Sequence, residues 1–374
     1  MRAIAKEKPL WFDRRRSYPL GPETSGEGDF FRADRDILAP SLPAIDFSRI
    51  LLYSCIRKPI TWGRRGAPGA GREDRGMIRP MFDRVVMATD LSPAWDQIVA
   101  CGGELRKLGC SGLILTYVIT PNFFGGPGES LPSPAASRLA AQRRVLEEKG
   151  LEVIIETPIG LPGRSLNGVA QKYGASLIII GSHGKSRWRE GVLGTFSGAV
   201  LHNVRFPLLI LPVQVAGGQE PSCLWHSTEL LSHLLFPTDF SQTAAEAMCY
   251  LELLAPRGVT SVTLLHALMT TPGKSGEPQG AAEAAAVARN FLDLLQGRLE
   301  AAGVPRVQTR VAVGHPFAVI LEALKTTDIS LIVLGTQGKG FIEEISVGSV
   351  AHNISRFAPC PLLLIPPADR DNRQ

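Results

Sequence analysis

A short glycine pattern occurs twice in this chain and constrains its fold more than any other feature. The pattern is Gly-x-x-Gly, nine further residues and then Gly-Thr or Gly-Ser, and it spans Gly181–Thr195 and Gly335–Ser349. Each copy directly follows an apolar, β-branched run that is typical of a buried strand, Ser176–Ile180 or Ser330–Leu334. Glycines leave backbone N–H groups bare, and a helix start offers unpaired N–H groups. The pattern therefore suits an anion such as phosphate.

The two glycine patterns belong to a longer duplication. Asp90 and Asp239 each follow a strand-like run and stand 149 residues apart, whereas Gly181 and Gly335 are separated by 154 residues. A nearly constant offset predicts a tandem repeat with a small change of length in its middle.

Strands and helices alternate through both halves from Phe82 onward. We expect strands at 84–89, 112–119, 151–156, 177–180 and 206–211, and again at 233–238, 261–267, 306–313, 329–334 and 361–365. Ser92, followed by Pro93, and Ser241 are expected to cap the helices after the first strand of each half. Alternation of this kind predicts an α/β fold with right-handed crossovers and a five-stranded parallel sheet in each half. Ligands of such sheets bind at the carboxyl ends of the strands.

Composition sets the boundaries of the two repeats. Residues 1–80 mix Pro, Gly and Arg without a sustained period, which predicts a disordered extension or sequence upstream of a true start at Met77 or Met81. A basic tail that touches lipid or nucleic acid is the alternative. The predicted domains are 82–213 and 233–366, with a linker over 214–232 and a polar tail over 367–374.

Charge and apolar content exclude some classes of protein. The net charge is +5, but the first 80 residues carry +6, so nothing in the two repeats suggests a nucleic-acid surface. No run approaches the roughly 18 apolar residues of a membrane span, and no signal peptide is recognisable. Six cysteines lack Cys-x-x-Cys spacing, which indicates reduced thiols and a cytoplasmic protein.

Both halves resemble the universal stress protein family. The resemblance rests on the two glycine patterns, on an aspartate after the first strand, and on the endings Phe206–Pro212 and Ala358–Pro366. It covers about 82–213 and 233–366. It implies two tandem flavodoxin-like, Rossmann-like sandwiches and binding of ATP, with Mg²⁺ as a possible companion. It also implies that the last strands pair the two domains within one chain, as they pair single-domain relatives into homodimers.

The resemblance further implies a role for each matching residue. The glycines and the hydroxyl residues would hold the phosphates, the aspartates would sit near the adenosine or the metal, and the residues at the ends of the second strands would contact the base. The first-half set is Asp90, Val118, Gly181, Gly184, Gly194, Thr195 and Ser197. The second-half set is Asp239, Ala267, Gly335, Gly338, Gly348 and Ser349, with Ala351 in place of the second hydroxyl.

Simpler explanations exist for several of these residues. Asp90 and Asp239 could cap the helices that follow them. His183 matches Gln337 in the second half, so a general-base role is not repeated. Lys185 could screen phosphate charge or remain a solvated loop residue. No Walker-type loop, dinucleotide fingerprint, catalytic set or metal-ligand set recurs in both halves.

The sequence thus favours a cytoplasmic, ATP-binding stress-response protein that acts on an unidentified protein partner, with self-association into a homodimer left open. Two alternatives remain at this point: a slow ATPase or adenylyl-transferring enzyme that uses the same loops, and an interaction module without nucleotide.

Overall fold

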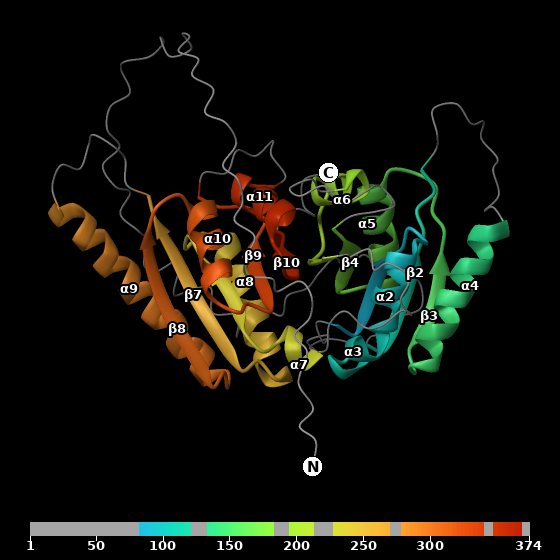
Figure 1. Ribbon diagram of the computed structural model, residues 1–374, viewed down its shortest axis with the longest axis horizontal. Coiled ribbons are helices and arrows are strands. Elements are labelled where there is room, and N and C mark those ends of the chain that lie inside the picture. Colours follow the sequence, from blue (N-terminus) through green and yellow to red (C-terminus); the bar gives the residue numbers. More distant parts are fainter. Residues whose placement is uncertain are drawn as a thin grey trace, which may run out of the picture. The chain divides into compact units, whose positions relative to one another are not determined.

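The structure is a computed structural model that describes residues 82–120, 133–182, 194–212, 227–269, 278–339 and 347–368 (Figure 1). The predicted extension over residues 1–80 and the loops between these ranges lie outside the described residues. Strands and helices alternate along the chain, as the periodicity predicts.

The first half contains five strands and the helices between them. In chain order these are β1 (Arg84–Ala88), α2 (Pro93–Ala100), α3 (Gly102–Lys107), β2 (Gly112–Thr116), α4 (Ser133–Glu148), β3 (Glu152–Glu156), α5 (Pro162–Tyr173), β4 (Leu177–Gly181), α6 (Thr195–Leu201) and β5 (Leu208–Leu211).

The second half repeats this order after a short helix. Its elements are α7 (Ser227–Leu230), β6 (Leu234–Pro237), α8 (Gln242–Leu254), the 3₁₀ turn η2 (Ala255–Arg257), β7 (Ser261–Leu268), α9 (Pro278–Ala301), β8 (Arg306–Val313), α10 (Pro316–Thr326), β9 (Leu331–Gly335), α11 (Ser349–Phe357) and β10 (Leu362–Ile365). Helix α7 occupies part of the segment that the sequence suggests is a linker.

The ten strands among the described residues form one sheet in the order β3-β2-β1-β4-β5-β10-β9-β6-β7-β8. Neighbouring strands run parallel within each half. The halves join through β5 and β10, which pair antiparallel with Leu209 opposite Leu363. The expected pairing through the last strands is therefore present within one chain.

Both faces of the sheet are covered, so the central strands carry apolar side chains on both sides. One core layer packs the sheet against α2, α3, α4, α8 and α9, and includes Trp95, Leu105 and Phe236. The other layer packs it against α5, α6, α10 and α11, and includes Leu166 and Ile354. Each half is thus the doubly wound α/β sandwich that the alternation predicts.

The helical segment that begins at Pro93 breaks at Cys101 into α2 and α3. The break coincides with a close approach of α4: a Cβ atom on Gly102 would lie 2.5 Å from Cδ2 of Leu146. Glycine at this position lets α4 pack directly on the backbone.

Candidate functional site

In each half, the aspartate and the first glycine of the pattern lie where the strand order reverses. In the first half β1 lies between β2 and β4, and in the second half β6 lies between β7 and β9. The chain leaves β1 and β4, or β6 and β9, on opposite sides of the sheet, and in sheets of this kind ligands bind at the carboxyl ends of such strand pairs. Asp90 and Gly181 stand at that point in one half, and Asp239 and Gly335 in the other.

A four-residue turn carries each aspartate, Thr89–Ser92 in one half and Thr238–Ser241 in the other. In both turns the threonine hydroxyl accepts a hydrogen bond from the N–H two residues on, at 3.0 and 3.1 Å. The aspartate Oδ1 accepts from the serine N–H at 2.9 and 3.0 Å. The residue after each aspartate has a positive φ, 60° at Leu91 and 59° at Phe240. Non-glycine residues in this left-handed conformation often mark functional sites.

The turn in the second half also holds the glycine loop. Oδ2 of Asp239 accepts a hydrogen bond from the N–H of Lys339 at 2.8 Å. A Cβ atom on Gly338 would lie 2.5 Å from the same oxygen, so this position has no room for a side chain. Asp239 therefore closes the turn that precedes α8, whose N-cap is Ser241, and in addition joins that turn to the loop after β9.

The corresponding contact in the first half falls outside the described residues. Oδ2 of Asp90 is buried and has no hydrogen-bond partner among the residues that the structure describes. Gly184 and Lys185, which match Gly338 and Lys339, belong to the segment that is not described.

The helices that follow the two loops start directly against the preceding strand ends. The N–H of Gly194 donates to the carbonyl of Ser182 at 3.1 Å, and the N–H of Gly348 donates to the carbonyl of Thr336 at 2.7 Å. Both glycines are N-cap residues and no side chain caps either helix. Helix α8, by contrast, is capped by the hydroxyl of Ser241.

Polar groups face outward at the N-termini of α6 and α11, which have no side-chain cap. The next N–H groups of α6 and α11 lack intrahelical acceptors, because the first turn of any helix does. Thr195 and Ser349, the first residues of these helices, are both exposed. A Cβ on Gly348 would lie 3.4 Å or more from its neighbours, which is ordinary van der Waals contact and no clash. The arrangement fits a phosphate group.

The structure shows packing or internal contacts for the remaining predicted residues. A Cβ on Gly335 would lie 3.0 Å from Cγ2 of Thr243, so this glycine lets β9 approach α8. Val118 is buried just beyond β2, and Ala267 is half-buried within β7. The hydroxyl of Ser197 is buried and donates to the carbonyl of Gly181 at 2.6 Å. The matching Ala351 is equally buried.

An aromatic cluster beside Asp239 is a feature that sequence reasoning missed. The Phe240 ring stacks on the His266 ring, with the two ring centroids 4.5 Å apart. The centroid of the Phe291 ring lies 5.1 Å from that of Phe240. The Lys339 ammonium lies 5.7 Å from the centre of the Phe240 ring. Burial lowers the pKa of His266, so its imidazole is neutral near pH 7. The sequence Thr-Asp-x-Ser occurs in both halves, and Phe240 is its third residue in the second half. This repeat is the sequence feature that could have drawn attention to Phe240.

The first half surrounds its aspartate turn differently. Leu91 replaces the aromatic ring, and the Arg138 guanidinium donates to the Leu91 carbonyl. The Thr89 hydroxyl donates to Gln142 at 2.9 Å, and Gln142 in turn donates to Asp96 at 2.8 Å. The two turns therefore share a backbone geometry and differ in the side chains around it.

The cysteines depart from the expectation of reduced thiols. Cys110 and Cys360 are free and buried, but Cys101 and Cys249 are disulfide-bonded. Spacing along the chain cannot reveal such bonds, because they depend on the distance between cysteines in the fold. Within the described ranges, none of the helices has both the length and the apolar character needed to cross a bilayer.

Comparison with known proteins agrees with this architecture. The pattern of the Universal stress protein family matches residues 81–212 and 231–366. Universal stress protein YxiE of Bacillus subtilis is 29% identical over 147 residues, which cover 36% of this chain and 99% of YxiE. A staphylococcal protein named for the same family, from Staphylococcus saprophyticus, is 43% identical over 82 residues, and the chain spans only 49% of its length.

A solved structure shows the same fold over both halves. The universal stress protein of Archaeoglobus fulgidus superposes with a TM-score of 0.54 at 19% identity, covering 76% of this chain and 98% of that protein. Two family matches, two flavodoxin-like sandwiches and the duplicated loop lead to one conclusion: the chain belongs to the universal stress protein family and carries two of its domains in tandem.

Proposed function

We propose that this stress-response protein binds an adenine nucleotide, ATP with Mg²⁺, in each half and signals its occupancy to a protein partner in the cytoplasm. One observation carries the proposal: at the strand-order reversal of each half, a helix with a glycine N-cap and no side-chain cap starts against the glycine loop. Bare N–H groups and the helix dipole at such a place favour a polyphosphate.

The residues divide into two roles in this proposal. Gly194 with Thr195, and Gly348 with Ser349, hold the phosphates at the helix starts. Asp239 positions the second loop, because both of its carboxylate oxygens accept backbone N–H groups. Val118 and Ala267, at or near the ends of β2 and β7, line the base side. A nucleotide that contacts the loop would change the surface that the loop presents to a partner, which is how we propose that binding is signalled.

Equilibrium titration of the full chain with Mg-ATP tests this proposal. We expect saturable binding, with a stoichiometry that falls by one site in Gly194→Asp and by one site in Gly348→Asp, because each new carboxylate repels phosphate at a helix start. Gly297→Asp is the charge-matched control: Gly297 lies in α9 with no atom within 4 Å of an added Cβ.

Two results would contradict the proposal. If the wild-type chain shows no saturable binding, the nucleotide role is wrong. If binding is unaffected by both site substitutions while the variants remain folded, the nucleotide lies elsewhere. Mass spectrometry of any ligand released from the purified protein identifies the nucleotide directly.

A further inference from the structure

The two ends of the ten-stranded sheet are β3 and β8, and no described strand pairs with the outer side of either (Figure 1). The N–H of Glu152 at the start of β3 and that of Gly314 just after β8 point inward, to the neighbouring strands. Because successive peptide groups of a strand point to opposite sides, alternate residues point their N–H groups outward. These are Val153 and Ile155 on β3, and Val307, Thr309, Val311 and Val313 on β8.

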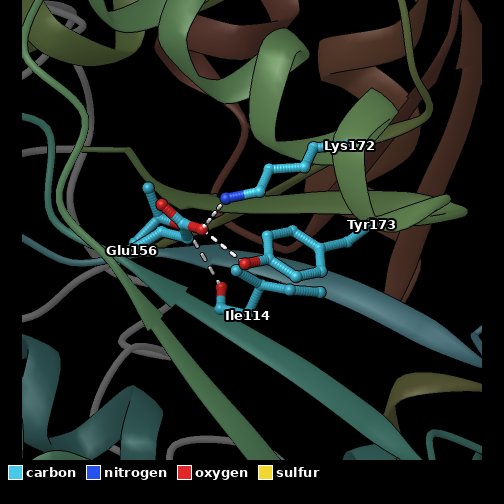
Figure 2. Close-up of polar contacts among 5 residues, drawn as sticks. Ile114, Glu156, Lys172 and Tyr173 are labelled. Atoms are coloured by element: carbon cyan, nitrogen blue, oxygen red, sulfur yellow. Dashed lines mark hydrogen bonds and ion pairs between the residues drawn. The ribbon is translucent and has the colours of Figure 1, made fainter. Parts of the chain in front are cut away.

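The two end strands carry opposite charges on the same face of the sheet. Glu152 and Glu156 project from β3 on the face covered by α5, and Arg306 and Arg310 project from β8 on the face covered by α10. Glu152, Arg306 and Arg310 are exposed. Glu156 is half-buried, and Figure 2 shows Lys172 and Tyr173 converging on its carboxylate.

We propose that β8 of one copy of this chain pairs antiparallel with β3 of a second copy, in the register that sets Arg310 opposite Glu152 and Arg306 opposite Glu156. The strand directions permit this: β3 and β8 run antiparallel in the sheet, so a second copy in the same orientation continues the sheet with the same faces aligned. A head-to-tail contact of this kind leaves one unpaired end strand at each end of an open assembly, so further copies can be added unless a rotation between copies closes a ring.

The hydrogen-bonding pattern agrees with this register. It sets Val153 opposite Thr309 and Ile155 opposite Val307, and all four of these residues point their N–H groups outward. The charged residues then form the intervening pairs that lack mutual hydrogen bonds, in which side chains across an antiparallel ladder come closest. A shift by two residues in either direction keeps the hydrogen bonds but removes the Arg310–Glu152 contact.

The same register also gives an exposed apolar side chain a place to pack. Ile154 is 45% exposed and would lie opposite Gln308. Gln308 lines a hollow of about 510 Å³, whose wall includes Leu235, Ala323 and Ile329. Burial of the Ile154 side chain in that hollow would remove apolar surface from water and favour association.

Charge also selects against other pairings of the two edges. Antiparallel pairing of β8 with β8 of another copy sets arginine opposite arginine, and pairing of β3 with β3 sets glutamate opposite glutamate. Like charges directly across a ladder are destabilising, whereas opposite charges attract. Lys172 compensates part of the Glu156 charge, so the discrimination rests chiefly on Glu152 and Arg310.

A mixing experiment with two charge-reversal variants of the full chain tests the proposal. The weight-average mass is measured by analytical ultracentrifugation over a range of concentrations at low salt, without nucleotide. We expect the wild-type mass to rise above that of one chain with concentration and to fall back in high salt. Arg310→Glu and Glu152→Arg should each stay at the mass of one chain, because each places like charges across the junction.

An equimolar mixture of the two variants should associate again, since each junction then joins a glutamate to an arginine. Arg144→Glu, a reversal at an exposed position of α4, is the control and should behave as wild type. The proposal is overturned if the wild-type mass is independent of concentration, because the edge charges would then only prevent association. It is equally overturned if the mixture fails to restore association. ATP binding enters none of these outcomes, so they are independent of the proposed function.

Discussion

The carboxylate of Asp239 accepts a hydrogen bond from the backbone N–H of Lys339, 2.8 Å away in space and 100 residues away along the chain. This bond joins the turn after β6 to the loop after β9. The other carboxylate oxygen of Asp239 accepts a hydrogen bond from the backbone N–H of Ser241. One side chain therefore holds two backbone segments together at the carboxyl ends of adjacent strands.

Removal of this carboxylate should destabilise the second half. Asp239→Ala loses two hydrogen bonds to a charged acceptor, and we expect the free energy of unfolding to fall by about 1–3 kcal/mol. Urea denaturation followed by circular dichroism measures the change. Asp293→Ala, at an exposed position of α9, is the control and should change little. An unaltered denaturation midpoint for Asp239→Ala would show that the hydrogen bonds of the Asp239 carboxylate contribute nothing to stability.

Gly338 and Gly348, near the start and at the end of the second loop, should respond differently to the same substitution. Gly338→Ala places a Cβ 2.5 Å from Oδ2 of Asp239, so the loop or the carboxylate must move, and we expect a loss of about 1–3 kcal/mol. Gly348→Ala meets nothing closer than 3.4 Å and has a φ of −66°, so it should cost less than about 0.5 kcal/mol. Thermal unfolding of the two variants compares them directly, and equal melting temperatures would contradict the role given to Gly338.

The contacts of Glu156 should make part of the stability depend on pH. Hydrogen bonds from Lys172 and from Tyr173 hold the pKa of Glu156 below its usual value, and the same contact raises the pKa of Lys172. A depressed carboxyl pKa contributes stability above the unfolded pKa, and this contribution is lost as the pH falls through the folded pKa. The Lys172 contribution is lost instead as the pH rises through its raised pKa.

We therefore expect the melting temperature of Lys172→Ala to lie below that of the wild type at pH 7. The difference should shrink as the pH falls below the folded pKa of Glu156. Melting curves of both proteins across the acid range measure it, with Lys325→Ala, an exposed lysine on α10, as the control. A difference that stays constant with pH would rule out the ion pair as its cause.

Cys110 and Cys360 should be unreactive in the folded protein. Burial raises the pKa of Cys110 and of Cys360 to about 12 in each case. Because the thiolate is the nucleophile, iodoacetamide at pH 8 should label neither residue in the native chain and both in urea. Mass spectrometry of tryptic peptides gives the extent of labelling. Rapid labelling of Cys360 in the native protein would mean that its site opens to solvent.

The local sequence pattern was sufficient to predict most of the strands and helices of this protein. The strand Arg306–Val313 has the expected bounds, and most other elements differ from expectation by a few residues at their ends. Such predictions succeed because side-chain periodicity and turn residues act over a few residues of chain. The duplication strengthened these predictions, because the strands and helices assigned in one half supported those assigned in the other.

The candidate site was predictable in its positions and not in its contacts. The sequence located Asp239, Gly338 and Gly348, but not the bond between Asp239 and Lys339 or the stacking of Phe240 on His266. These pairs come from different strands and loops, and only the strand order brings them together.

Sequence alone therefore determined the two α/β repeats, the parallel strands within each and the glycine loops after β4 and β9. The tertiary structure decided which residues meet at the reversal of strand order, which cysteines are bonded, and that an acidic and a basic strand form the two ends of one sheet. The physical reason is that propensity and periodicity are encoded locally, whereas contacts between distant segments depend on how the whole chain packs.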